Sequence, residues 1–102
     1  MKKVKVETEA ELVKKIIKAL RAIPKTEAMK IHGDMYQERG IPDILVCFKG
    51  HFFAFEVKRP GKEKNVSKYQ ALKLERVRAA GGRALVISSV KEALDAIGVK
   101  PK

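Results

Sequence analysis

The stretch that decides the fold is Ile41–Lys58, with the sequence IPDILVCFKGHFFAFEVK. It holds two apolar runs separated by Lys49-Gly50, which predicts two antiparallel strands joined by a tight turn. Counting outward from that turn places Asp43, at the start of the first run, opposite Glu56, near the end of the second. The hairpin therefore brings two carboxylates together.

This pair of carboxylates predicts a metal site. Opposed residues on antiparallel strands have Cβ atoms about 4.5–5.5 Å apart, a distance at which two carboxylates can bind one divalent cation. Without a cation, the like charges of Asp43 and Glu56 would repel each other. Because strand side chains alternate between faces, Lys58 projects from the same side as Glu56 and adds a cationic group beside the site.

An alternative interpretation makes Asp43 a turn residue after Pro42, and Glu56 with Lys58 a solvated pair on an exposed strand. Apolar residues on both faces of the hairpin argue against it, because such strands are covered by helices on both sides. A carboxylate in that position costs free energy unless it is compensated. One face carries Leu45, Cys47, Phe52 and Ala54, and the other carries Ile44, Val46, Phe48, Phe53, Phe55 and Val57.

Length and composition set the outer limits. The chain has 102 residues, which predicts a single domain over residues 1–102. The one cysteine, Cys47, leaves no disulfide framework or thiolate metal site and fits a reducing compartment. Since no apolar run is long enough to span a membrane and the N-terminus lacks the apolar core of a signal peptide, we expect a soluble cytoplasmic protein with no membrane partner.

Net charge indicates the class of partner. The 23 Lys and Arg residues outnumber the 12 Asp and Glu residues, giving a formal charge of +11. So large an excess on a small protein attracts polyanions, of which nucleic acid is the commonest. The alternative is that this charge serves only solubility.

The first predicted helix begins near Glu9 and ends before Pro24. Thr8 and Glu11 have the spacing of a capping box, and apolar residues follow at helical spacing. Glu9 lies on the side of the apolar stripe, so it is either a first-turn acid favoured by the helix dipole or a third carboxylate at the metal site. The stripe consists of Leu12, Val13, Ile16, Ile17, Leu20 and Ile23.

Polar and basic loops flank the carboxylates along the chain. A short strand is expected over residues 27–32, and the basic loop RPGKEKNVSK follows Lys58. The loop side chains could contact phosphate oxygens, or they could be solvated surface charges. We interpret His32 as a strand-end residue with local hydrogen bonds, because no second histidine stands at zinc-ligand spacing. The candidate nucleic-acid contacts are Lys30, Gln37, Arg39, Arg59, Lys62, Lys64 and Lys68.

The remainder of the chain supplies two more helices and a strand. Ser67 and Gln70 form a second capping box, which predicts a helix that runs to Gly81-Gly82 and carries Gln70 on its inward side. A strand over residues 83–87 and a helix over residues 90–97 complete the order α-β-β-β-α-β-α. Because a crossover helix returns the chain to the same sheet, we expect an α/β fold with a mixed central sheet flanked by helices.

These motifs resemble those of a nuclease superfamily. Pro42-Asp43, followed after a hairpin by Glu56-Val57-Lys58, resembles the PD-(D/E)xK signature of restriction-endonuclease-like nucleases. More narrowly, Gly40–Asp43, the stretch FEVKRPG, and Ser67–Gln70 followed by a helix and Gly-Gly are similar to the virus-type replication-repair nuclease (VRR-Nuc) domain. The similarity covers nearly the whole chain and implies a restriction-endonuclease-like α-β-β-β-α-β core.

The resemblance also implies the roles of five side chains. Asp43 and Glu56 would be metal ligands, Lys58 the catalytic lysine, Glu9 an acid of the first helix that also serves the metal, and Gln70 a supporting active-site residue. The implied cofactor is Mg²⁺ or Mn²⁺, with no small-molecule cofactor. The implied reaction is hydrolysis of phosphodiester bonds in DNA.

Small members of this family resemble junction-resolving enzymes, which predicts a homodimer that cuts branched DNA such as a four-way junction. Two alternatives stay open: a flap or single-strand nuclease, and a basic DNA-binding module whose carboxylates are structural. An assay of linear, flap and four-way DNA, with and without Mg²⁺ or Mn²⁺, would distinguish the three.

Overall fold

The computed structural model describes residues 6–33 and 38–99 of the chain. The elements in chain order are α1 (Glu9–Arg21), β1 (Thr26–Lys30), β2 (Ile44–Phe48), β3 (His51–Val57), α2 (Lys68–Ala79), β4 (Arg83–Ile87) and α3 (Val90–Ile97). This order is the one predicted from the sequence, and the expected α/β class is confirmed.

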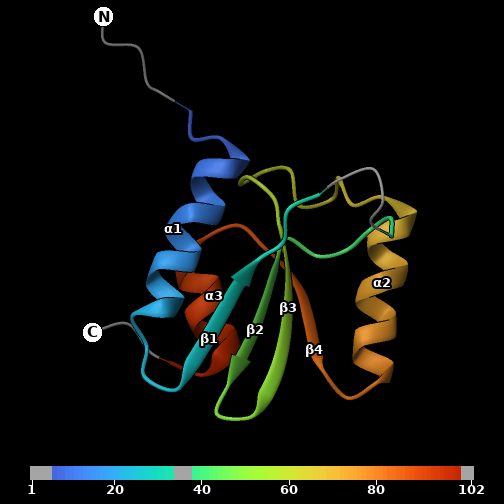
Figure 1. Cartoon of the computed structure of the whole chain (residues 1–102). Helices are drawn as coiled ribbons and strands as arrows, with labels where there is room; N and C mark the ends of the chain where they lie inside the picture. The colour runs from blue at the N-terminus through green and yellow to red at the C-terminus, as the bar shows by residue number, and fades with distance from the viewer. Residues whose placement is uncertain (1–5, 34–37, 100–102) are drawn as a thin grey trace, which may run out of the picture.

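The four strands form one mixed sheet in the order β1-β2-β3-β4. The pairs β1–β2 and β2–β3 are antiparallel, and β4 runs parallel to β3 because the crossover helix α2 returns the chain to the same edge. Helices α1 and α3 lie on one face of the sheet, and α2 lies on the other (Figure 1). The two strands of the hairpin, β2 and β3, therefore occupy the centre of the sheet.

The turn of the hairpin sets the register on which the site depends. Lys49 and Gly50 have φ angles of 50° and 83°. Two successive positive φ angles are typical of the type I′ turn, whose twist matches that of the flanking strands. The pairing counted from the sequence is the one observed, and its outermost pair lies one residue inside Asp43 and Glu56.

Two apolar cores of unequal size hold the layers together. The larger lies between the sheet and the pair α1 and α3, where Phe55, Ile16 and Leu20 are completely buried. The smaller lies under α2 and is built on Ala54 and Leu74. Burial of large side chains, each contributing about 1.5–3 kcal/mol, makes the first face the main source of stability.

Coverage of the second face is less complete than the sequence predicted. Cys47 is exposed and Phe52 is 42% exposed. Because α2 packs against β3 and β4, no helix of the described residues covers the same face of β1 and β2 (Figure 1). Alternation of apolar residues indicates which face a side chain occupies, but not how far a helix extends across that face.

Two predicted boundaries also differ from the structure. The strand expected over residues 27–32 ends at Lys30, so His32 lies outside it and is exposed. The first helix ends at Arg21 with Ala22 as its C-cap, so Ile23, the last residue of the predicted apolar stripe, lies outside it. In the part of the chain that the structure describes, no helix has the length and apolar character needed to cross a membrane.

Candidate active site

The candidate active site lies at the edge of the sheet where β3 ends and β2 begins. Asp43 precedes β2, Glu56 is the penultimate residue of β3, and Lys58 follows it. Helices α1 and α2 both begin at this edge, with Glu9 as the first residue of α1 and Gln70 in the first turn of α2 (Figure 1). The topology thus directs all five predicted side chains to one end of the molecule.

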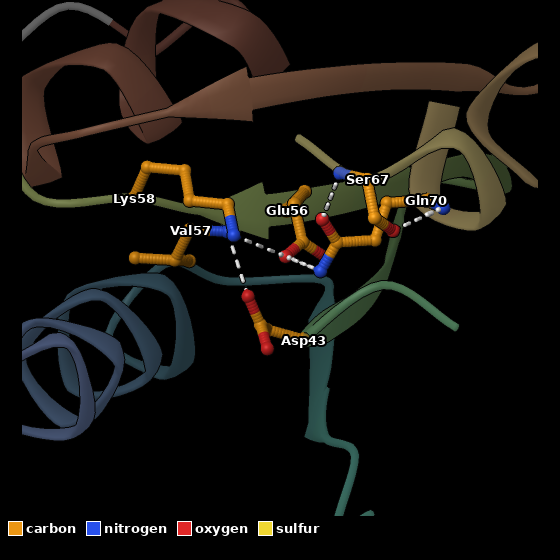
Figure 2. Close-up of polar contacts among 6 residues, drawn as sticks. All are labelled: Asp43, Glu56, Val57, Lys58, Ser67 and Gln70. Atoms are coloured by element: carbon orange, nitrogen blue, oxygen red, sulfur yellow. Dashed lines mark hydrogen bonds and ion pairs between the residues drawn. The ribbon is translucent and has the colours of Figure 1, made fainter. Parts of the chain in front are cut away.

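Asp43 is held by the backbone of the neighbouring strand. The N–H of Val57 donates a hydrogen bond of 2.8 Å to Asp43 Oδ2 (Figure 2). The side chain thus extends the pairing of β2 and β3 by one contact beyond the last strand pair. A buried backbone N–H needs such a partner, so this contact fixes one oxygen of Asp43 at the end of β3.

Glu56 is a buried carboxylate with one satisfied oxygen. The side chain is 2% exposed, and its Oε2 accepts a hydrogen bond of 2.7 Å from Gln70 Nε2. Lys58 Nζ lies 3.5 Å from the same oxygen, and the lysine side chain is 11% exposed. Glu56 Oε1 is buried and has no hydrogen-bond partner among the described residues. The interpretation as a solvated surface pair is therefore wrong.

Gln70 performs two tasks with one amide group. Its Oε1 accepts a hydrogen bond of 2.9 Å from the N–H of Ser67, and Ser67 Oγ accepts one from the N–H of Gln70, which completes the predicted capping box. The Nε2 of the same amide donates to Glu56 (Figure 2). The start of α2 and the orientation of Glu56 are thus coupled through a single side chain.

The charge state of Glu56 reflects this environment. Burial, together with the nearby charge of Asp43, raises the pKa of Glu56 to about 7. Lys58 acts in the opposite direction, through its charge and its hydrogen bond, and the charge of Glu9 adds a smaller increase. Glu56 is therefore a group that a nearby cation would ionise fully.

A pH dependence of stability follows from this raised pKa. Below the ordinary value of 4.5, Glu56 is protonated in both the native and the unfolded state. Between 4.5 and about 7 the unfolded chain loses the proton while the native protein keeps it, so rising pH favours unfolding. We expect the free energy of unfolding of the metal-free protein to fall by about 3 kcal/mol across this window through this one group.

Urea unfolding in EDTA at pH 5, 6, 7 and 8 measures that fall, and Glu56→Gln isolates the group responsible. The difference in unfolding free energy between the wild type and the variant should change across the window. If the unfolding free energies of the wild type and of Glu56→Gln change in parallel with pH, the raised pKa of Glu56 is contradicted.

The residues at this edge fit a divalent cation in part. Two carboxylates lie at adjacent strand positions, and Glu56 Oε1 is a buried oxygen without a partner, which is the kind of atom a hard cation takes as a ligand. Within residues 6–33 and 38–99, however, no group of three or more His, Cys, Asp or Glu side chains is close enough together to hold a metal ion. The predicted third ligand, Glu9, is thus not gathered with Asp43 and Glu56 into such a group.

Comparison with known proteins agrees with this fold. A solved chain described as a VRR_NUC domain superimposes with a TM-score of 0.65, is 26% identical in sequence, and is covered over 92% of its length by 87% of this chain. This chain has the fold of a VRR-Nuc domain. No family model and no curated protein matches the sequence. The VRR-Nuc domain is a nuclease fold of the restriction-endonuclease-like type, which agrees with the expected α/β class.

The two acids at the start of α1 have different surroundings. Glu11 and Thr8 form the predicted capping box, with both hydrogen bonds at 3.1 Å. Glu9 is half-buried, and its charge acts on Glu56. We expect Glu9→Gln to slow DNA cleavage with little loss of stability. Glu11→Ala should cost about 1 kcal/mol or less through loss of the cap and leave cleavage unchanged.

Cleavage rates and urea unfolding of the two variants test this contrast. The reverse pattern, with cleavage abolished in Glu11→Ala and stability reduced in Glu9→Gln, would contradict the assignment of Glu9 to the site.

The candidate nucleic-acid contacts of this chain separate into three places. The cationic groups of Arg39 and Lys68 both lie over the ring of Tyr69, at 5.1 and 5.4 Å from the ring centroid. Lys30 lies at the end of β1, on the other side of the site. Gln37 falls outside the described residues. Arg59, Lys62 and Lys64 belong to the loop between β3 and α2.

Sequence reasoning missed two residues beside the site. Tyr69 is 41% exposed, and its hydroxyl accepts a hydrogen bond of 3.2 Å from Arg39 Nη1. Gly40 has a φ of 81° and lies so close to α2 that a Cβ on it would be 2.7 Å from the N of Gln70 and nearer still to the carbonyl of Tyr69. The available signals were a glycine directly before the Ile-Pro-Asp motif and an aromatic residue beside the capping box.

Proposed function

We propose that this VRR-Nuc-like domain is a metal-dependent DNA endonuclease. Its active site, at Asp43 and Glu56, hydrolyses phosphodiester bonds of DNA. The observation that carries the proposal is the buried, unpartnered Oε1 of Glu56, beside a second carboxylate and a lysine, in a nuclease fold. A buried acid with a raised pKa, a charge partner and an unsatisfied oxygen marks a functional site more often than a structural one.

Asp43 and Glu56 are the residues that would hold Mg²⁺ or Mn²⁺, and Glu9 of α1 acts on Glu56 through its charge. When bound there, the ion would neutralise charge on the scissile phosphodiester and make an attacking water more acidic. Two carboxylates leave most positions of an octahedral ion open to water and to phosphate oxygens, as Mg²⁺ requires.

The protein's own residues position the reacting groups. Asp43 is fixed by the N–H of Val57, and Glu56 is fixed by Gln70, so both carboxylates are preorganised on the ends of central strands. Lys58 is held by its backbone N–H, which donates a hydrogen bond of 3.0 Å to the carbonyl of Ile87. From there its Nζ would orient the attacking water or stabilise charge on the phosphate.

DNA is the substrate that the charge favours. The formal charge of +11 supplies a general attraction for phosphates, and basic residues lie on both sides of the carboxylates along the chain. We propose that Lys62 and Lys64 contact phosphates on one side of the cut, and that Arg39 and Lys68 contact them at the start of α2. No small-molecule cofactor is needed for this reaction.

Branched DNA and a homodimer form the finer part of the proposal. A chain of 102 residues has little surface with which to enclose a four-way junction alone, whereas two copies would present two sites to two strands. The wild-type protein should then have the mass of a dimer in solution and bind a four-way junction more tightly than a linear duplex of equal length.

A cleavage assay on labelled DNA tests the proposal. Linear duplex, flap, single-stranded and four-way substrates are incubated with the wild-type protein in Mg²⁺, in Mn²⁺ and in EDTA, and light scattering gives the mass. Cleavage of the junction only with a divalent ion supports the proposal. Preferential cleavage of flap or single-stranded DNA would contradict the junction specificity and favour a flap or single-strand nuclease. DNA binding without cleavage in either metal would favour a non-catalytic DNA-binding module.

A further inference from the structure

A basic groove lies between α1 and the edge strand β1, and neither Asp43 nor Glu56 lines it. It has a volume of about 600 Å³, and Ile17 and Ala22 form part of its lining. The basic residues that line the groove come from two separate parts of the chain, the helix α1 and the end of β1 with the residues that follow it. The basic residues are Lys14, Lys18 and Arg21 on α1, and Lys30 and His32 at and beyond the end of β1.

We propose that this groove binds the phosphate backbone of the DNA segment that leads away from the cut. The proposal rests on the proposed nuclease function and adds a binding track to it. Preference of cationic side chains for the last turn of a helix would explain Lys18 and Arg21 alone. It does not explain why Lys30 and His32, from a different element, border the same hollow.

The sign of the charge in the groove is uniform. Among the described residues, no Asp or Glu lines it. Strand alternation explains part of this, because Glu27 of β1 pairs with Cys47 and points to the opposite face of the sheet from Lys30. Lys15 of α1 pairs with Glu7, whereas no ion pair among the described residues involves Lys14. The groove lysines are therefore available to an external anion.

The groove begins beside the catalytic edge. Lys30 pairs with Ile44, and the N–H of the next residue, Ile31, donates a hydrogen bond of 2.8 Å to the carbonyl of Asp43. From this end the groove follows α1 to Arg21, the last residue of the helix, whose Nε donates a hydrogen bond to the carbonyl of Ala28. A DNA strand bound at the carboxylates can thus continue into the groove without crossing the β-sheet.

The length of the groove matches a short run of phosphates. Lys14 and Arg21 are seven residues apart, and at 1.5 Å per residue this is about 10 Å along the helix. Phosphates of one DNA strand are about 3.4 Å apart along the duplex axis, so this distance is long enough for several of them. Lys14, Lys18 and Arg21 stand on one side of α1 at spacings of four and three residues, which suits one phosphate each.

A pair of charge-matched variants tests the groove. Lys14→Gln/Lys18→Gln removes two charges from the groove, and Lys91→Gln/Arg83→Gln removes two from α3 and β4, outside it. Binding of a linear duplex is measured in EDTA, where no cleavage interferes, across a salt series. The slope of log affinity against log salt should become shallower by about 2 in the groove variant, or about 1 for each phosphate that a lysine no longer neutralises. The control variant should keep the wild-type slope.

Thermal unfolding of both double variants confirms that they remain folded. Equal slopes in the two variants, or a wild-type slope in the groove variant, would overturn the proposal. DNA binding is measured without metal, so the two proposals can fail separately. A wild-type protein that cuts no DNA would contradict the nuclease proposal but would not affect the binding measurement. If the protein cleaves DNA but the groove variant keeps the wild-type salt slope, only the groove proposal is contradicted.

Discussion

Replacing Glu56 by glutamine is expected to lower DNA cleavage by about a thousandfold or more, and to raise the stability of the metal-free protein at pH 8. The amide keeps the size of the side chain and can still accept the hydrogen bond from Gln70. It removes the buried charge whose pKa is raised to about 7. Activity and stability therefore move in opposite directions, which loss of folding would not produce.

Asp43→Asn should lower cleavage to a similar extent. Its amide oxygen can replace Asp43 Oδ2 as the acceptor for the N–H of Val57, so the end of β3 stays in place. Glu75→Gln is the matched control, because Glu75 is an exposed acid of α2 that pairs with Arg78 at 3.7 Å. Single-turnover rates in Mg²⁺, urea unfolding in EDTA and DNA binding are compared for the three variants. Wild-type cleavage by Glu56→Gln or Asp43→Asn would refute the metal site, and DNA binding should be retained in all three.

The features that the sequence predicted best are those set by local interactions. The capping boxes at Thr8 and Ser67 each involve residues three apart, and both form as expected. The hairpin register depends on one two-residue turn, so counting from Lys49-Gly50 located Asp43 and Glu56 at neighbouring positions. The family resemblance rests on these same motifs, and the structural comparison confirms it.

The features that the sequence could not supply depend on where a helix lies relative to the sheet. The capping box placed Gln70 at the start of α2 and the family resemblance implied that it supports the active site, but its contact with Glu56 depends on where the start of α2 lies relative to the end of β3. The contact between Arg39 and Tyr69 joins residues 30 positions apart. Phe52 is exposed because α2 does not cover this part of the sheet. The alternation of apolar residues in the hairpin cannot indicate how far a helix extends across the face.

The close approach of Gly40 to α2 gives the second large prediction. Gly40→Ala should lower the free energy of unfolding by about 2–4 kcal/mol, the sum of a left-handed backbone penalty and overpacking. The added Cβ would meet backbone atoms of Tyr69 and Gln70, which cannot rotate away as a side chain can. Either the loop before Asp43 or the start of α2 must move.

Because Gln70 links that helix start to Glu56, the displacement should also reach the site. A shift of about 1 Å in catalytic geometry can cost a hundredfold in rate, so Gly40→Ala should cleave DNA at least about tenfold more slowly even below its melting temperature. Gly81→Ala is the matched control. Gly81 also has a positive φ, 96°, but a Cβ there would meet nothing within 4 Å, and it follows the opposite end of α2. It should show only the backbone penalty of about 1–2 kcal/mol and normal cleavage. The two variants are compared by urea unfolding and by cleavage rate. If both variants lose the same stability and cleave DNA at the same rate, the contact between Gly40 and α2 does not position Gln70, and the proposed coupling of that loop to Glu56 is contradicted.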